Sequence, residues 1–113
     1  MTNKIMKNID LATPLTLGTL VTYQTGQIVS RTLVQNRAVS LTLFAFDTGE
    51  EISSHESKGD AMVQLLDGKA KITIGTGEYF LTAGETVVMP AGMPHALLAV
   101  EPFKMLLTVI FPG

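Results

Sequence analysis

Two histidines, His55 and His95, are the side chains of this sequence best suited to transition-metal or proton chemistry. His55 lies in the hydrophilic stretch SSHESKGD, and His95 lies in PAGMPHALLAV; apolar, strand-like segments flank both stretches. The chain has no cysteine, so a thiolate metal site, a cysteine nucleophile and a disulfide are all excluded. Any site must therefore be built around imidazole, and only if the fold brings these two distant positions together.

The elements that would position the histidines are β-strands. In RAVSLTLFAF and KAKITI, successive side chains alternate between the two faces of a strand. In FKMLLTVIF, the apolar residues at every second position share one face. This period of two is typical of half-buried strands. Further strands are expected in LTLGTLVTY, QIVSRTLVQ, AMVQLL, EYFLT, ETVVMP and HALLAV. About nine or ten short strands, separated by turns such as Asp67-Gly68, predict an all-β fold of two packed antiparallel sheets.

The spacing of glycine, proline and histidine resembles the two motifs of the cupin family of double-stranded β-helix (jelly-roll) barrels. In the first motif, Gly49, His55 and Gly68 occupy the expected positions. In the second, Gly84, Pro90, Gly92 and His95 match without a gap. The resemblance covers residues 38–111 and implies one small, RmlC-like cupin domain over residues 1–113, with its barrel core at about 38–111.

The same resemblance implies a metal site that is only partly present. A typical metal-binding cupin holds one divalent ion with three histidines and a glutamate. In this chain the second histidine of motif one falls at Ser57, and the glutamate falls at Ala61 or Met62. The family's divalent transition metals (Mn, Fe, Ni, Cu or Zn) would have His55 and His95 as their ligands.

Three interpretations of His55 and His95 remain open. They form a metal site completed by Asp60 or water, a metal-free pocket for a small polar or anionic ligand, or two ordinary polar residues. Asp60 follows the loop after His55 and could reach the barrel mouth. Glu56 should point away from His55 if the strand continues. We expect Ser57, Ala61 and Met93 to line the ligand pocket.

Size, charge and hydropathy narrow the class of protein. A chain of 113 residues suits one domain, and a net charge of −2 without a basic cluster argues against nucleic-acid binding. No apolar run is long enough for a membrane span, and there is no signal-peptide pattern, so we expect a cytoplasmic protein. The high apolar fraction, 46%, favours a homodimer.

Three functions follow from this sequence, and the residues do not decide between the first two. The first is a small cupin with a metal and a small polar substrate at the barrel mouth, in which the metal acts as a Lewis acid. The second is a non-catalytic cupin that binds or senses a small ligand without metal. The third is a structural or interaction protein whose fold has lost its site, and the two retained histidines argue against it. No serine-histidine-carboxylate or paired-carboxylate arrangement offers another catalytic centre, and a fold alone supplies no reaction.

Overall fold

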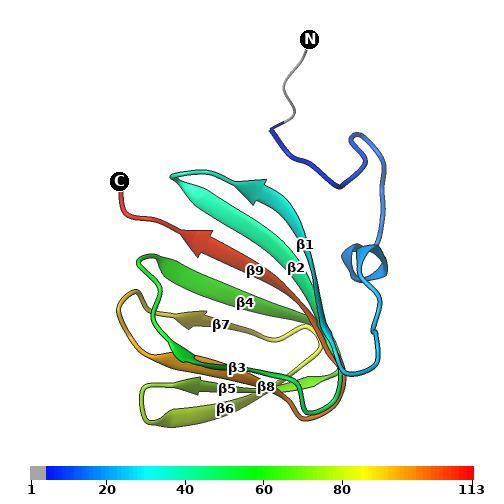
Figure 1. Cartoon of the computed structure of the whole chain (residues 1–113). Helices are drawn as coiled ribbons and strands as arrows, with labels where there is room; N and C mark the ends of the chain where they lie inside the picture. The colour runs from blue at the N-terminus through cyan, green and yellow to red at the C-terminus, as the bar shows by residue number, and fades with distance from the viewer. Residues whose placement is uncertain (1–4) are drawn as a thin grey trace.

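The computed structural model describes residues 5–113, which form two antiparallel sheets facing one another (Figure 1). The five-stranded sheet has the order β1-β2-β9-β4-β7, and the four-stranded sheet has the order β3-β8-β5-β6. The strands are β1 (Ile28–Gln35), β2 (Val39–Phe46), β3 (Glu51–His55), β4 (Asp60–Asp67), β5 (Lys69–Ile74), β6 (Gly77–Thr82), β7 (Thr86–Met89), β8 (His95–Ala99) and β9 (Phe103–Ile110). The predicted all-β fold with two packed antiparallel sheets is confirmed.

The prediction of one strand is wrong. The segment LTLGTLVTY forms no strand within the described residues; it contains a short 3₁₀ helix, η1 (Leu17–Leu20). Its apolar residues Leu17, Leu20 and Val21 are used in another way, because they pack on the outer face of the five-stranded sheet. The apolar pattern therefore indicated burial correctly, but a packed, irregular segment buries apolar side chains as well as a strand does.

The main core lies between the two sheets and consists of the inward residues of alternating strands. Phe46 and Phe103 stack with their ring centroids 4.4 Å apart, and both side chains are fully buried. Around them lie Val63, Leu65, Ala70, Ile72, Leu81, Met89, Leu97, Ala99 and Met105. The two sheets come together on the side where β2 ends and β9 begins, and they diverge toward the side that carries the C-terminus (Figure 1). Phe46 is the last residue of β2 and Phe103 the first of β9, so the aromatic stack lies on the side where the sheets converge.

The side where the sheets converge, here called the closed end, is held by Tyr23, Asp67 and Lys104. The Tyr23 hydroxyl donates to Asp67 Oδ2 at 2.5 Å, and Lys104 Nζ donates to the Gly18 carbonyl at 2.6 Å. Gly68 has a φ of 79°, and a side chain there would collide with the Pro102 carbonyl. The polar groups of this end are thus occupied by one another and by the backbone.

A second apolar cluster lies on the outer face of the five-stranded sheet, under the N-terminal segment. Leu43 and Ala45 of β2 are fully buried there, although Phe46 of the same strand faces the barrel interior. Arg31 fastens the covering segment, since its guanidinium donates to the carbonyls of Asn8 at 2.6 Å and of Leu20 at 3.1 Å. Strand β2 therefore has apolar residues on both faces because both are covered.

This N-terminal segment leaves part of the outer face bare. Val88 on β7 and Ile110 on β9 are about half exposed, and such apolar surface is typical of protein contacts. The homodimer expected from composition stays a prediction, which light scattering can test. Within residues 5–113, no helix is both long and apolar enough to cross a membrane.

Candidate functional site

The fold brings the two histidines into direct contact. His55, the last residue of β3, pairs with His95, the first residue of β8. Their rings meet edge to face with centroids 4.3 Å apart, and the two Nε2 atoms lie 3.1 Å from each other. The contact lies at the side where the sheets diverge, here called the open end and formed by His55, His95 and the loops 56–59 and 90–94. The sequence-based expectation that the fold unites these positions is confirmed.

A bulge in β3 aims His55 into the barrel. Ile52 and His55 are three positions apart along β3, whereas the residues paired with them, Leu97 and His95, are two positions apart on β8. In a regular strand Ile52 and His55 would point to opposite faces. The extra residue is absorbed in the bulge, so Ile52 and His55 both line the interior cavity. Bulges often redirect side chains in this way near functional sites.

Backbone carbonyls fix the orientation of both rings. His55 Nδ1 lies 3.1 Å from the Ser53 carbonyl, and His95 Nδ1 lies 3.2 Å from the Met93 carbonyl. A carbonyl only accepts hydrogen bonds, so the hydrogen of each neutral ring is assigned to Nδ1. Both Nε2 atoms then present lone pairs to one another at 3.1 Å. With both hydrogens on Nδ1 that arrangement is repulsive, and the repulsion is relieved when a proton or a metal cation lies between the two nitrogens, or when one ring carries its hydrogen on Nε2 and donates it to the other ring.

The two rings differ in their surroundings. His95 is 2% exposed, whereas His55 is open to solvent. Burial lowers the pKa of His95 below its usual value, and the neighbouring His55 lowers it further. The Met93 carbonyl opposes both effects by raising this pKa. His95 is thereby favoured in its neutral form, the form of imidazole that binds metals.

An internal cavity of about 210 Å³ lies beside the histidine pair. Most of its walls are apolar, and its polar lining residues are His55, His95, Glu56 and Ser57. The apolar walls are formed by Ile52, Ala61, Met89, Leu97, Met105, Leu107 and Val109. The structure thus brings Ser57 and Ala61, two of the predicted pocket residues, to the cavity together with both histidines.

Met93, the third predicted pocket residue, does not line this cavity. Its side chain is 40% exposed and lies against Gly75, and only its backbone serves the site, through the carbonyl that faces His95. Glu56 was expected to point away from His55, yet it does line the cavity. Strand β3 ends at His55, so the alternation behind that expectation stops there.

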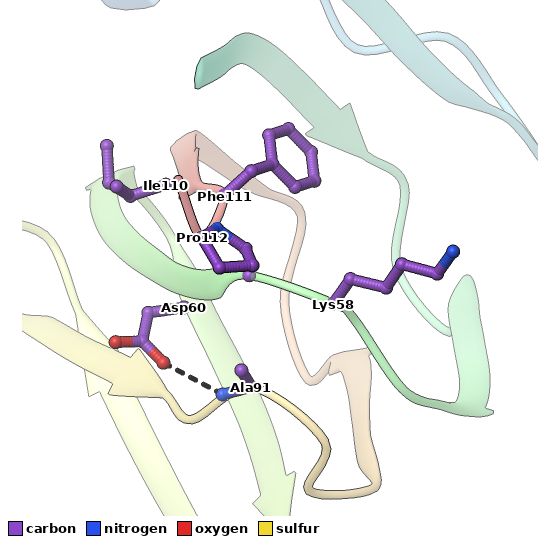
Figure 2. A pocket seen from close by; sticks show the side chains of 7 residues that line it. Lys58, Asp60, Ala91, Ile110, Phe111 and Pro112 are labelled. Carbon is purple, nitrogen blue, oxygen red and sulfur yellow. Dashed lines mark hydrogen bonds between the residues drawn. The ribbon is translucent and has the colours of Figure 1, made fainter. Parts of the chain in front are cut away.

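Asp60 lies outside the barrel, apart from the histidines. Its Oδ1 accepts a hydrogen bond from the Ala91 amide at 2.8 Å (Figure 2). It lines a separate pocket of about 230 Å³ with Lys58, Ala91 and the C-terminal residues 110–112. The structure therefore does not bring Asp60 to the histidine pair as a third ligand. Instead, Asp60 holds the turn that leads to His95.

The Nε2 atoms of His55 and His95 could occupy two coordination positions of one metal ion. Metal–imidazole bonds are about 2.0–2.1 Å long, so two nitrogens 3.1 Å apart can reach the same ion. Among residues 5–113, no group of three or more His, Cys, Asp or Glu side chains could hold a metal. Any further ligands would have to be water, a bound small molecule or a neutral group.

Comparison with known proteins defines the family. The Cupin domain model matches residues 42–111, so the chain belongs to the cupin family. It is 47% identical to a conserved protein of unknown function from Streptococcus pyogenes, with a TM-score of 0.97 over 100% of this chain and 99% of that one.

Other solved structures that resemble this chain are also cupins. A cupin superfamily protein from Desulfitobacterium hafniense is 32% identical, with a TM-score of 0.90 over 95% of this chain and 98% of that one. An RmlC-like cupin from Shewanella frigidimarina, 18% identical with a TM-score of 0.72 over 77% and 78% of the two chains, shows the shared fold alone. No curated protein matches the chain. The protein is thus a small cupin, as the motif spacing predicted.

Proposed function

We propose that this cupin binds a small molecule in its barrel cavity and that His55 and His95 hold one divalent transition metal beside it. The observation that carries the proposal is the pair of Nε2 atoms 3.1 Å apart, each with its Nδ1 engaged by a carbonyl. Two fixed lone pairs that converge on one place call for a cation there. With two protein ligands, coordination positions are left for water and for the bound molecule.

In this proposal, backbone carbonyls orient the two rings and apolar side chains exclude water. The Ser53 and Met93 carbonyls orient the two rings, as hydrogen-bond partners of metal-binding histidines commonly do. The apolar walls keep water from the inner part of the cavity, which strengthens electrostatic interactions at its polar end. A bound metal would supply Lewis acidity to an oxygen of the small molecule.

A second candidate function is metal-free binding. The same two nitrogens can share one proton, which makes the pair a single positive charge able to accept an anionic ligand. The fact that favours this candidate is the absence of a third protein ligand among residues 5–113. Catalytic metal sites usually have at least three such ligands.

Metal content decides between the two candidates. The protein should be purified without a histidine tag and titrated with Mn, Fe, Co, Ni, Cu and Zn in competition with a chelator. The proposal expects one metal per chain for at least one of these ions, and at least about 100-fold weaker binding in His55→Ala and in His95→Ala. Equal affinity in the wild type and both variants would refute a histidine-held metal. No binding of any ion, together with stabilisation by small anions, would support the metal-free function.

A further inference from the structure

We infer that the natural ligand of this cavity is an uncharged molecule that is mostly hydrocarbon, with one oxygen-bearing group at the histidine pair. The inference rests on the proposed function only in placing a small molecule in the barrel cavity. It requires neither a bound metal nor a charge on the histidines, because the chemistry of the cavity walls supports it.

The walls away from the histidines are apolar, and Ala61, Met89, Leu97 and Met105 in them are at most 3% exposed. Strands β4, β8 and β9 each lie between two other strands, so their backbone polar groups are used within the sheets. A ligand hydroxyl placed against these strands would lose its water without gaining a hydrogen-bond partner. The part of the ligand that enters the barrel is therefore hydrocarbon.

Water is a poor occupant of the same space. A buried water molecule usually makes about two to four hydrogen bonds to polar groups, and the apolar side chains of these walls offer none. The replacement of such weakly held water by an apolar group favours binding. Met89 and Met105 are also flexible enough to pack against hydrocarbon of varied shape. An apolar ligand thus gains both from its contacts and from the water that it displaces.

The lining residues offer no partner for a charged group inside the barrel. Among residues 5–113, those that line the cavity include no lysine or arginine, and Glu56, which lines it next to His55, is exposed to solvent. An ion pair with an exposed carboxylate contributes little to binding, whereas an unpaired charge is costly to bury. The cavity therefore favours a neutral ligand over both a carboxylate and an ammonium compound.

A neutral oxygen suits the histidine pair with or without a metal. A hydroxyl group both donates and accepts hydrogen bonds, so an alcohol can donate to an Nε2 lone pair or accept a hydrogen from Nε2. The same oxygen can bind a metal held by His55 and His95. The histidines thus orient the polar group of the ligand, and the apolar walls hold its hydrocarbon part.

Methionine-methyl NMR titrations of the full-length protein test the inference with 1-butanol, butyrate, butylammonium and erythritol, which share a chain of four carbons. Met89 and Met105 report on the cavity, and Met62 and Met93, which do not line it, serve as internal controls. In chelator-treated protein, 1-butanol should bind at least about 10-fold more tightly than each of the other three probes. Equal or tighter binding of any of these three, or no shift of Met89 and Met105 with 1-butanol, would overturn the inference.

Two matched variants tie this preference to the cavity walls. Val109 and Val87 are both partly buried against the main core, but only Val109 lines the cavity. Val109→Thr places a hydroxyl in the wall and should weaken 1-butanol binding at least about fivefold, whereas Val87→Thr should leave it unchanged. If Val109→Thr fails to fold, Ile52→Thr makes the same test from the other sheet. Unchanged 1-butanol affinity in the cavity variant that folds would contradict the inference.

The two proposals fail in different ways. If the protein binds no metal but 1-butanol is preferred in chelator-treated protein, the metal proposal fails and the ligand class stands. If one metal binds per chain and 1-butanol is not preferred, the ligand class fails and the metal proposal stands.

Discussion

The open and closed ends of the barrel use polar residues in opposite ways. At the closed end, Tyr23 donates to Asp67, and Lys104 donates to a backbone carbonyl and lies over the Tyr23 ring, 5.0 Å from its centroid. At the open end, the Nδ1 atoms of His55 and His95 are engaged by carbonyls, but their Nε2 atoms have only one another. The polar side chains of the closed end are paired with one another and with the backbone, whereas the two Nε2 atoms of the open end contact one another beside a cavity.

Side-chain packing also differs between the closed end and the open end. The Phe46–Phe103 stack fills the barrel near the closed end, and a cavity of about 210 Å³ remains near the open end. Protein interiors are normally close-packed, so a retained cavity gives up contacts that a filled core would make. The barrel is thus filled by side chains at the closed end and less completely filled at the open end.

The largest predicted effect compares two leucines of nearly equal burial. Leu65 lies in the filled part of the core, and Leu97 lines the cavity; they are 2% and 3% exposed. Leu65→Ala should lower the free energy of unfolding by an amount in the upper part of the roughly 2–5 kcal/mol range for such changes. Leu97→Ala should cost near the lower limit, because its cavity side has fewer packing partners. Urea denaturation measures both, and equal losses would contradict the contrast.

The next prediction concerns pH, since the two ends should lose stability at opposite limits. Burial lowers the pKa of His95 in the fold, so the unfolded chain binds its proton more readily. Stability of chelator-treated protein should be complete above pH ~6.5, the ordinary histidine pKa, and decline as the pH falls below it. His95→Gln should flatten this decline, and an unchanged decline in that variant would contradict the assignment to His95.

At the closed end the sign is reversed. Burial raises the pKa of Tyr23, and the hydrogen bond to Asp67 raises it further. The stability that this group contributes should therefore be complete below pH ~10, the ordinary tyrosine pKa, and be lost as the pH rises through the higher value in the fold. Tyr23→Phe should lack this alkaline loss. Urea denaturation between pH 8 and 11 would show it, and identical profiles for the two proteins would contradict it.

The smallest predicted effect separates two aspartates that both brace loops. Asp60 accepts from the Ala91 amide at the open end, and Asp47 accepts from the Gly26 and Thr48 amides at the closed end. Each change to alanine should lower stability slightly, because backbone amides lose a carboxylate acceptor. Only Asp60→Ala should also weaken metal binding, by several-fold, because the turn it holds carries the Met93 carbonyl that orients His95.

The conservative variant completes that comparison. Asp60→Asn keeps an oxygen that can accept from Ala91 and should retain most of the metal affinity. Chelator competition measures the affinities of all three variants. Equal weakening by Asp47→Ala and Asp60→Ala would show that general destabilisation, and not the position of the turn, is responsible.

The sequence predicted the parts of this fold that depend on regular spacing. Alternation along the strands and the Gly-Pro-Gly-His spacing of the second motif are local patterns, and they were enough to predict two packed sheets and to place His55 and His95 together at the barrel mouth, although not their direct contact. The N-terminal segment was misjudged because apolar content alone does not distinguish a strand from a packed 3₁₀ turn.

The details of the site could not be predicted in the same way. The bulge before His55 and the end of β3 interrupt the alternation, and this is why Glu56 lines the cavity against expectation. The role of the Met93 carbonyl and the position of Asp60 depend on the path of loop 90–94, which no periodic pattern encodes. The walls formed by Met89 and Met105 come from the pairing of distant strands.

The most direct test of the central claim is a crystal structure of the untagged protein, soaked in the tightest-binding metal, with anomalous data collected at the edge of that metal. One anomalous peak is expected within bonding distance, about 2.0–2.3 Å, of Nε2 of both His55 and His95. A peak at another place in the chain, or none at the histidine pair after soaking, would contradict it.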